Sequence, residues 1–247
     1  MHDKKIYGKI KEVNFKNIQT LFDSRTESIN SPLHAIMLQN QDSDLPVRRN
    51  LYEQEIILTE ILINQDSKVL DLGCGYGRIA QMIPNNISYY YGLDFSEKFI
   101  RIAQQNFLYN DNFFFSNYDV TNFYNNNVIK YKKFNVVFIV GTMMYLNDFA
   151  VSQVYTNILD YLEENKSAVI YIRESVSLLE DRITLDNFYS DKLESNYSAI
   201  YRTDAEYKNL FKIFESKGFY LSKSLLFDES LANNSETKQK FYILRRD

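Results

Sequence analysis

The sequence predicts an α/β fold, a doubly wound and mostly parallel sheet of seven strands with an N-terminal helical arm. Short apolar runs alternate with amphipathic helical stretches over residues 46–173, as in proteins whose strands are joined by helices. The first apolar run ends in a glycine-rich turn, which is typical of a buried parallel strand. A loop alone joins the last two runs, so we expect an antiparallel strand at the C-terminal end.

The elements begin with an arm. Residues 1–45 show weak helical periodicity, and we expect them to form a lid over the active site, whereas residues 46–247 form the main domain. Ser43 or Asp44 is expected to cap the first helix of that domain. The predicted strands are residues 68–72, 89–93, 113–115, 134–140, 168–172, 219–226 and 241–244.

Helices are expected in most intervals between these strands. The glycine-rich turn is expected to lead into a helix, and Ser96, Asn147 and Thr203 stand where later helices begin. Residues 174–200 are polar and irregular. We therefore interpret them as a loop or a short helical insertion over the strand ends.

Composition and charge exclude several kinds of protein. The formal net charge of -4 argues against a surface that neutralises nucleic-acid phosphates, which would be basic. One cysteine and two histidines, without a compact carboxylate cluster, predict neither a disulfide framework nor a metal site. The longest apolar run, residues 136–146, is shorter than the roughly 20 residues of a membrane span. We expect a cytoplasmic protein that acts on a small molecule.

The glycine-rich turn is the first candidate binding motif. It reads Asp71-Leu72-Gly73-Cys74-Gly75-Tyr76-Gly77, at the edge where open α/β sheets bind ligands. A dinucleotide-binding turn would have Gly-x-Gly-x-x-Gly, and here Arg78 stands where the third glycine would fall. The spacing favours a nucleoside without a pyrophosphate, and a purely structural turn is the alternative.

Acidic residues follow the next two predicted strands. Asp94 ends the second strand, where its carboxylate can accept hydrogen bonds from both hydroxyls of a ribose. Asp119 follows the third strand and is a candidate acceptor for the amino group of adenine, with Phe95 and Val120 beside the ring. A solvated or capping acid is the alternative for each.

Together these motifs resemble those of class I S-adenosylmethionine-dependent methyltransferases, which have a Rossmann-like fold. The resemblance rests on residues 69–80, Asp94, Asp119 and residues 134–146, and the antiparallel C-terminal pair extends it. It implies S-adenosylmethionine as the cofactor and S-adenosylhomocysteine as its product. The implied cofactor contacts are Arg49 (or Arg48) at the methionine carboxylate, and Asp71, Gly73, Cys74, Gly75, Gly77, Asp94, Phe95, Ser96, Asp119, Val120 and Gly141.

Methyl transfer from a sulfonium is an in-line displacement, so the acceptor must be held close to the methyl carbon. A hydroxyl acceptor benefits from a general base, whereas a phosphate-type oxygen is already an anion. His34 and Glu174 are the candidate bases, and Tyr145, on the methyl-bearing side, completes the candidate catalytic set. The candidate substrate-binding residues are Arg173, Tyr201 and Arg202.

The predicted acceptor is a small molecule. Residues 141–144 read Gly-Thr-Met-Met, where amino-methylating nucleic-acid enzymes of this class usually carry Asp/Asn-Pro-Pro-aromatic. The arm and Tyr201-Arg202-Thr203 resemble methyltransferases of bacterial surface-polysaccharide clusters. We therefore expect O-methylation of a sugar hydroxyl or phosphoramidate precursor of capsule. Two alternatives stay open, an N-methyltransferase acting on a small amine or amino sugar, and a non-catalytic binding partner with this fold.

Overall fold

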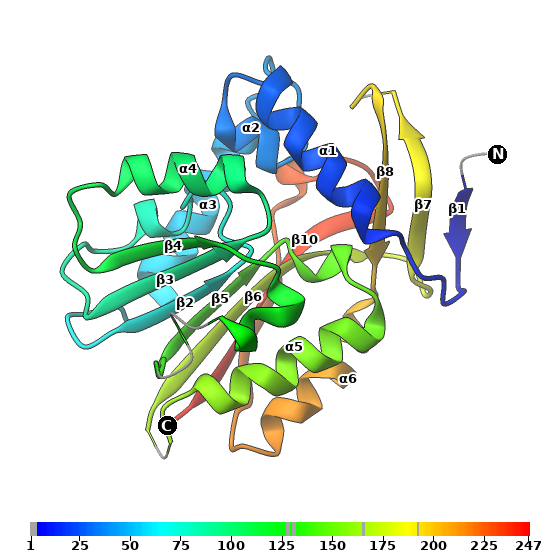
Figure 1. The fold of residues 1–247 in the computed structure, drawn as a ribbon. Coiled ribbons are helices and arrows are strands. Elements are labelled where there is room, and N and C mark those ends of the chain that lie inside the picture. Colours follow the sequence, from blue (N-terminus) through cyan, green and yellow to red (C-terminus); the bar gives the residue numbers. More distant parts are fainter. Residues whose placement is uncertain (1–3, 127–128, 130–131, 165, 192) are drawn as a thin grey trace.

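The computed structural model describes residues 4–126, 129, 132–164, 166–191 and 193–247. Its main sheet has seven strands in the order β4-β3-β2-β5-β6-β10-β9 (Figure 1). Only β10 runs antiparallel to its neighbours, β6 and β9, so the predicted fold class is confirmed. The strands are β2 (Lys68–Leu72), β3 (Tyr89–Asp94), β4 (Phe113–Asn117), β5 (Val136–Val140), β6 (Ala168–Ser177), β9 (Tyr220–Leu226) and β10 (Thr237–Arg246).

Helices cover both faces of this sheet because its central strands are apolar on both sides. On β2, Val69 packs into a core with α3 (Leu45–Glu60) and α4 (Glu97–Asn106). The next residue, Leu70, packs into a second core with α5 (Asp148–Tyr161) and α6 (Asp204–Glu215). Successive strand residues point to opposite faces, so one continuous apolar run supplies both cores.

Helix starts agree with two of the predicted caps. Thr203 and Glu206 form a capping box at the start of α6, and the Ser96 hydroxyl accepts from the backbone N–H of Phe99 at the start of α4. The prediction of a helix directly after the glycine-rich turn is wrong. Only a 3₁₀ turn, η1 (Ala80–Met82), follows, because Pro84 forces the residue before it out of helical geometry.

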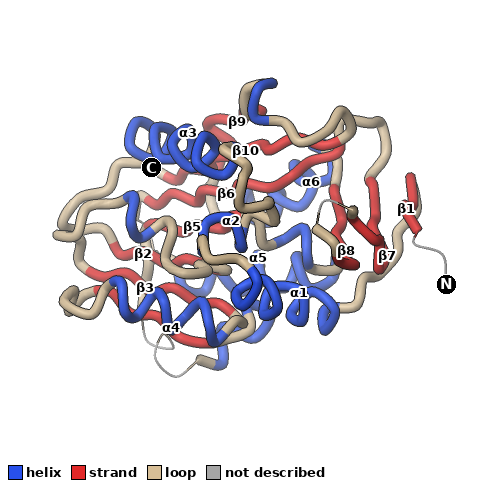
Figure 2. Tube along the Cα trace, turned by 90° about the horizontal axis from the view of Figure 1, so that it is seen from above, coloured by secondary structure: helices blue, strands red, loops and turns tan. Residues whose placement is uncertain are grey.

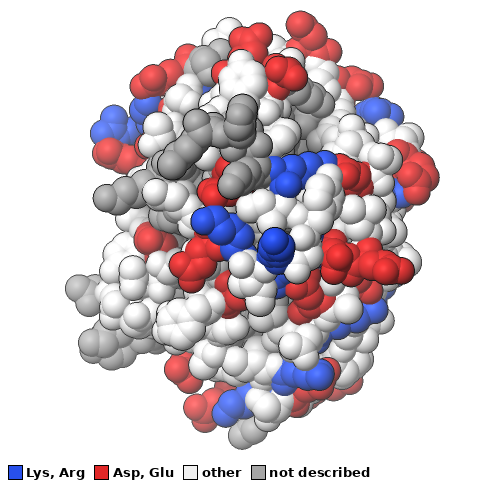
Figure 3. Space-filling model, turned by 90° about the vertical axis from the view of Figure 1, so that its right-hand side faces the viewer, with Lys and Arg blue, Asp and Glu red and all other residues white. Residues whose placement is uncertain are grey.

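A second sheet replaces the loop expected at residues 174–200, and that prediction was wrong. β6 continues to Ser177, and β7 (Ile183–Ser190) and β8 (Ser195–Tyr201) form a hairpin. β1 (Lys4–Tyr7) from the arm pairs antiparallel with β7, which gives the order β1-β7-β8. In Figure 1 these three strands stand to one side of the main sheet. Figure 3 shows acidic and basic side chains intermixed on the face of the molecule that lies on this side.

The rest of the arm lies over the carboxyl ends of the parallel strands. Its helices are α1 (Phe15–Ser28), which packs on α4 and β8, and α2 (Pro32–Ile36), which packs on α3 (Figure 2). Asp23 of α1 accepts a hydrogen bond of 3.1 Å from the Ser96 hydroxyl. The arm is therefore docked on the main domain, and its role as a lid stays a prediction. Within the described residues, no helix is long and apolar enough to cross a membrane.

A buried ion network fixes the turn that follows β5. Glu174 of β6 is fully buried, and its carboxylate accepts from three successive backbone N–H groups, those of residues 142–144, at 2.9–3.2 Å. Arg202, also fully buried, donates to the carbonyl oxygens of Met143 and Leu146. It also pairs with Asp148 at the start of α5. The 3₁₀ turn η3 (Met143–Tyr145) is thus clamped between one anion and one cation.

We predict that Glu174→Gln destabilises the protein by about 2–4 kcal/mol, because one amide oxygen replaces two carboxylate oxygens and its NH₂ group faces backbone donors. Burial raises the pKa of Glu174 to about 7, so urea unfolding is measured at pH 8, where the carboxylate is ionised. The exposed Glu164→Gln is the matched control, with a change within about 0.5 kcal/mol. Equal stability of the two variants would contradict the clamp.

Candidate active site

A cavity of about 300 Å³ lies at the carboxyl ends of the parallel strands, beneath the arm. Strand ends, the turn after β5, the arm and the loop before β10 all contribute to its wall. It brings together residues that the sequence places far apart. The predicted site residues that line it are Arg49, Asp71, Gly73, Cys74, Gly75, Asp94, Phe95, Val120, Gly141, Tyr145, Arg173 and Tyr201.

The glycine-rich turn is held close to the turn after β5. A Cβ atom on Gly73, whose φ is +80°, would lie 2.1 Å from the Thr142 hydroxyl oxygen, so only glycine fits there. Gly77 lies outside the cavity lining. A Cβ atom on Gly77 would meet the rings of Phe107 and Phe115 at 3.2 Å, so this glycine lets the turn pack on aromatic side chains.

Asp94 is fixed by backbone donors at the edge of the cavity. One carboxylate oxygen accepts from the N–H of Gly75 and the other from the N–H of Ser96, both at 2.9 Å. Each oxygen keeps a second lone pair that can accept from a ligand hydroxyl. Burial raises the pKa of Asp94 to about 6, although the two backbone donors act in the opposite direction. Ser96 itself does not line the cavity.

Asp71 has a buried oxygen that is short of a partner. The Tyr90 hydroxyl donates to its Oδ2, while Oδ1 has no hydrogen-bond partner within the part of the chain that the structure describes. Burial raises the pKa of Asp71 to about 7. Because buried acceptors are nearly always hydrogen-bonded, Oδ1 fits a donor supplied by a ligand in the cavity.

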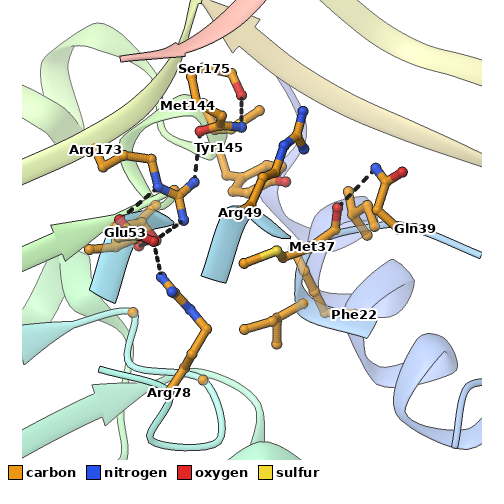
Figure 4. Close-up of a pocket in the computed structure, with 18 of the residues that line it drawn as sticks. Phe22, Met37, Gln39, Arg49, Glu53, Arg78, Met144, Tyr145, Arg173 and Ser175 are labelled. Atoms are coloured by element: carbon orange, nitrogen blue, oxygen red, sulfur yellow. Dashed lines mark hydrogen bonds and ion pairs between the residues drawn. The ribbon is translucent and has the colours of Figure 1, made fainter. Parts of the chain in front are cut away.

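Two arginines of the cavity wall converge on one carboxylate, and a third arginine lies nearby (Figure 4). Glu53, 1% exposed, accepts from Arg78 at 2.8 Å and from two nitrogens of Arg173 at 3.1 and 3.3 Å. Burial alone would raise the pKa of Glu53, but Arg173 and Arg78 lower it to about 2.

The third arginine, Arg49, has no acidic partner among the described residues. Its guanidinium donates only to the carbonyl oxygen of Leu231, at 2.9 and 2.6 Å. Burial, with Arg173 and Arg48 nearby, lowers its pKa to about 10, so it is a cation at neutral pH. Sequence reasoning missed Glu53 and Arg78. The spacing of Glu53 four residues after Arg49, on the buried face of α3, was the available signal.

Tyrosines form another part of the wall. The hydroxyls of Tyr197 and Tyr201 lie 3.2 Å apart, and the ring of Tyr145 packs edge-on against Phe22 at 5.3 Å between centroids. Burial raises the pKa of all three hydroxyls. They are therefore neutral phenols, which suits them to donate hydrogen bonds and not to remove protons.

Four other predicted residues lie outside the cavity lining. Glu174 and Arg202 hold the turn after β5, and their predicted roles in catalysis and substrate binding stay predictions. His34 uses both ring nitrogens, with the Ser31 hydroxyl at 2.7 Å and the Ser43 carbonyl oxygen at 2.8 Å. Asp119 caps the 3₁₀ turn η2 (Val120–Asn125) by accepting from the N–H and the hydroxyl of Thr121.

Comparisons with known proteins agree with this geometry. Residues 69–165 match a family model described as a methyltransferase domain. Phosphoethanolamine N-methyltransferase 1 from Haemonchus contortus has a similar fold, with a TM-score of 0.70, 19% identity, and coverage of 94% of this chain and 48% of that chain. A Leishmania major S-adenosylmethionine-dependent methyltransferase has a TM-score of 0.63 and 17% identity, and the match covers 90% of this chain and 81% of that chain.

Magnesium protoporphyrin IX methyltransferase from Synechocystis PCC 6803, solved with bound S-adenosylmethionine, gives a TM-score of 0.61 at 14% identity, with coverage of 96% of this chain and 99% of that chain. Among curated proteins, no sequence matches the chain significantly. At these identities the structures show the fold, and the domain match adds the activity. The chain is therefore an enzyme with a methyltransferase domain, on the fold of S-adenosylmethionine-dependent methyltransferases.

Proposed function

We propose that the enzyme methylates an oxygen atom of a small acceptor, a sugar hydroxyl or a phosphoramidate precursor, in the synthesis of a bacterial capsule. The observation that carries the proposal is the division of the cavity by β5. On one side lie groups suited to the cofactor, and on the other lie hydroxyl and amide side chains suited to a polar acceptor. The capsule part is supported by the resemblance around Tyr201-Arg202-Thr203.

In the cofactor half of the cavity we place the ends of β2 and β3, the arm above them and Arg49 of α3. There Asp94 would accept from the ribose hydroxyls, Asp71 Oδ1 from the methionine ammonium, and Arg49 would pair with the methionine carboxylate. Phe95 and Val120 would flank the adenine ring. The orphaned oxygen of Asp71 and the unpaired charge of Arg49 both fit a zwitterionic amino acid group. When bound, the cofactor supplies a methyl group on a positively charged sulfur.

The acceptor half comprises Ser175, Ser190, Tyr145, Tyr197, Tyr201, Asn234 and Thr237. These side chains come from β6, the second sheet, η3, the loop before β10 and the first residue of β10. They are neutral and polar, so they can orient a hydroxylated ring next to Gly141 at the end of β5. The clamp formed by Glu174 and Arg202 keeps Tyr145 in place, so positioning is the contribution these residues make to the reaction.

N-methylation of a small amine is the second candidate. It is favoured by the similar structure from Haemonchus contortus, an N-methyltransferase solved with phosphoethanolamine and S-adenosylhomocysteine. A neutral amine needs no base before it attacks, so it too would be served by a cavity that only positions its acceptor.

We predict that affinity for S-adenosylhomocysteine falls about tenfold between pH 7 and pH 5. Protonation of Asp94, whose pKa is about 6, removes a lone pair that would accept from the ribose, so the loss occurs as pH falls. Calorimetry in Asp94→Asn should give weaker binding at pH 7 and a shallower slope, with the remaining slope reporting Asp71. An unchanged slope in Asp94→Asn would remove Asp94 from the cofactor site.

The proposed reaction is tested with purified enzyme, S-adenosylmethionine and a panel of acceptors. The panel holds nucleotide-activated sugars, phosphoramidate precursors, and matched amines. We expect S-adenosylhomocysteine above background with an oxygen acceptor, and a product whose added methyl group lies on oxygen by NMR. Turnover of the amines alone would establish the second candidate, and no turnover of any oxygen acceptor would contradict the proposal.

A further inference from the structure

We propose that the methylated atom is an oxyanion of the acceptor, a carboxylate or phosphate-type oxygen that is held near Arg173 and needs no general base. This inference rests on the proposed function, methyl transfer to an oxygen atom of a small acceptor, and specifies that this oxygen already bears a negative charge. It arises from three features of the cavity wall: the placement of its acids, its surplus of hydrogen-bond donors, and its balance of charges.

The acids that line the cavity are not placed to act as a base. Glu53 is held by Arg78 and Arg173, with a strongly lowered pKa. Asp71 and Asp94 lie at the ends of β2 and β3, on the cofactor side of β5. Glu174 and His34 lie outside the cavity lining. Both carboxylate oxygens of Glu174 and both ring nitrogens of His34 already make hydrogen bonds within the protein. Among the described residues, a neutral hydroxyl in the acceptor half would find no acid or histidine placed to take its proton.

The acceptor half is instead rich in donors. Arg173 donates to the Gln239 side-chain oxygen at 2.8 Å, and the Gln239 NH₂ group donates to the Ser175 hydroxyl oxygen at 2.8 Å. The Ser175 hydroxyl proton is thereby left to donate into the cavity. The Tyr145 hydroxyl makes no hydrogen bond with the described residues, and one hydroxyl of the Tyr197–Tyr201 pair is also left to donate. Such a surface matches a ligand with several oxygen lone pairs.

The charges of the lining require one more anion. Arg49, Arg78 and Arg173 balance Glu53, Asp71 and Asp94, so the ionised wall has no net charge. S-adenosylmethionine has two positive groups and one negative group, and its binding leaves one positive charge uncompensated. Buried charges are costly unless they are paired, so an acceptor with one negative charge fits best.

The transfer step then neutralises charge. A lone pair of the acceptor oxygen forms the O–CH₃ bond as the S–CH₃ bond breaks, and the electron pair of the broken bond stays on sulfur. The products are a methyl ester and S-adenosylhomocysteine, with no proton released. Because opposite charges disappear together, a cavity shielded from water favours this step over the charged ground state.

The test compares anion binding to two cofactor complexes of the whole enzyme. Sinefungin is an unreactive analogue with an ammonium where the cofactor has its sulfonium, so it adds one positive charge that S-adenosylhomocysteine does not. Calorimetric titrations with inorganic phosphate, and separately with acetate, should show at least one of these anions binding about tenfold more tightly to the sinefungin complex. The anion that responds identifies the phosphate or the carboxylate class.

Two variants locate the site. Arg173→Gln should abolish the difference in anion affinity between the sinefungin and S-adenosylhomocysteine complexes. Tyr145→Phe, which keeps the ring and removes the hydroxyl, should reduce this difference severalfold. Arg101→Gln, on the exposed surface of α4 where Arg101 pairs with Glu97, is the matched control and should leave this difference in anion affinity unchanged.

Equal anion affinities in the two complexes of the wild type would overturn the inference, as would a tenfold difference that persists in both Arg173→Gln and Tyr145→Phe. Failure of sinefungin and S-adenosylhomocysteine to bind at all would instead contradict the cofactor site on which the proposed function depends. The two failures are therefore distinguishable.

Discussion

The clamp on the turn after β5 is the interaction on which the active site depends. The Glu174 carboxylate accepts hydrogen bonds from three backbone N–H groups of this short turn. The Arg202 guanidinium donates hydrogen bonds to two of its carbonyl oxygens. β6 carries Glu174 and then runs on beside the second sheet, whereas Arg202 directly follows β8. The turn that presents Tyr145 to the cavity is therefore fixed by both sheets at once. This explains why a fully buried charge is retained at each position, since each ion has all its main contacts inside the protein.

The charged side chains of the cavity wall determine which ligand the cavity fits. Glu53 pairs with both Arg78 and Arg173 in a buried part of the cavity wall, while Arg49 has only a carbonyl oxygen as its partner among the described residues. Asp71 offers the complementary feature, a buried carboxylate oxygen without a partner among the described residues. An arrangement with one free cation and one free anion is suited to a zwitterionic ligand, and it supports placing the amino acid part of the cofactor between Arg49 and Asp71.

The sequence allowed the main sheet to be predicted well, because each buried parallel strand is a continuous apolar run bounded by turn residues. The second sheet escaped prediction for a physical reason. β7 pairs with β1, which lies near the other end of the chain, and the hairpin buries Ile183, Leu185 and Ile200 only at one end. Its other half is only partly buried and mixes polar residues with Phe188, Tyr189 and Tyr197. No strict alternation of apolar and polar residues therefore marks this half as a strand.

Site residues divide in a similar way. Asp94 and the glycine-rich turn were predictable because a strand end fixes where each lies, and both line the cavity. Glu174 was predicted as a candidate base and Arg202 as a candidate substrate contact. In the structure both bind the backbone of the turn after β5, which comes from a distant segment of the chain and so could not be foreseen from the local sequence. Glu53 was missed because an acidic residue on a helix is usually solvent-exposed. Its burial becomes evident only when the residues that pack on that face of the helix are known.

The central claim is that S-adenosylmethionine binds in this cavity. The most direct test is amide hydrogen exchange with and without S-adenosylhomocysteine, followed by mass spectrometry. The account predicts slower exchange in the glycine-rich turn, at residues 94–96, in the clamped turn after β5 and in the arm at residues 36–39, with little change elsewhere. No protection, or protection confined to other segments, would contradict it.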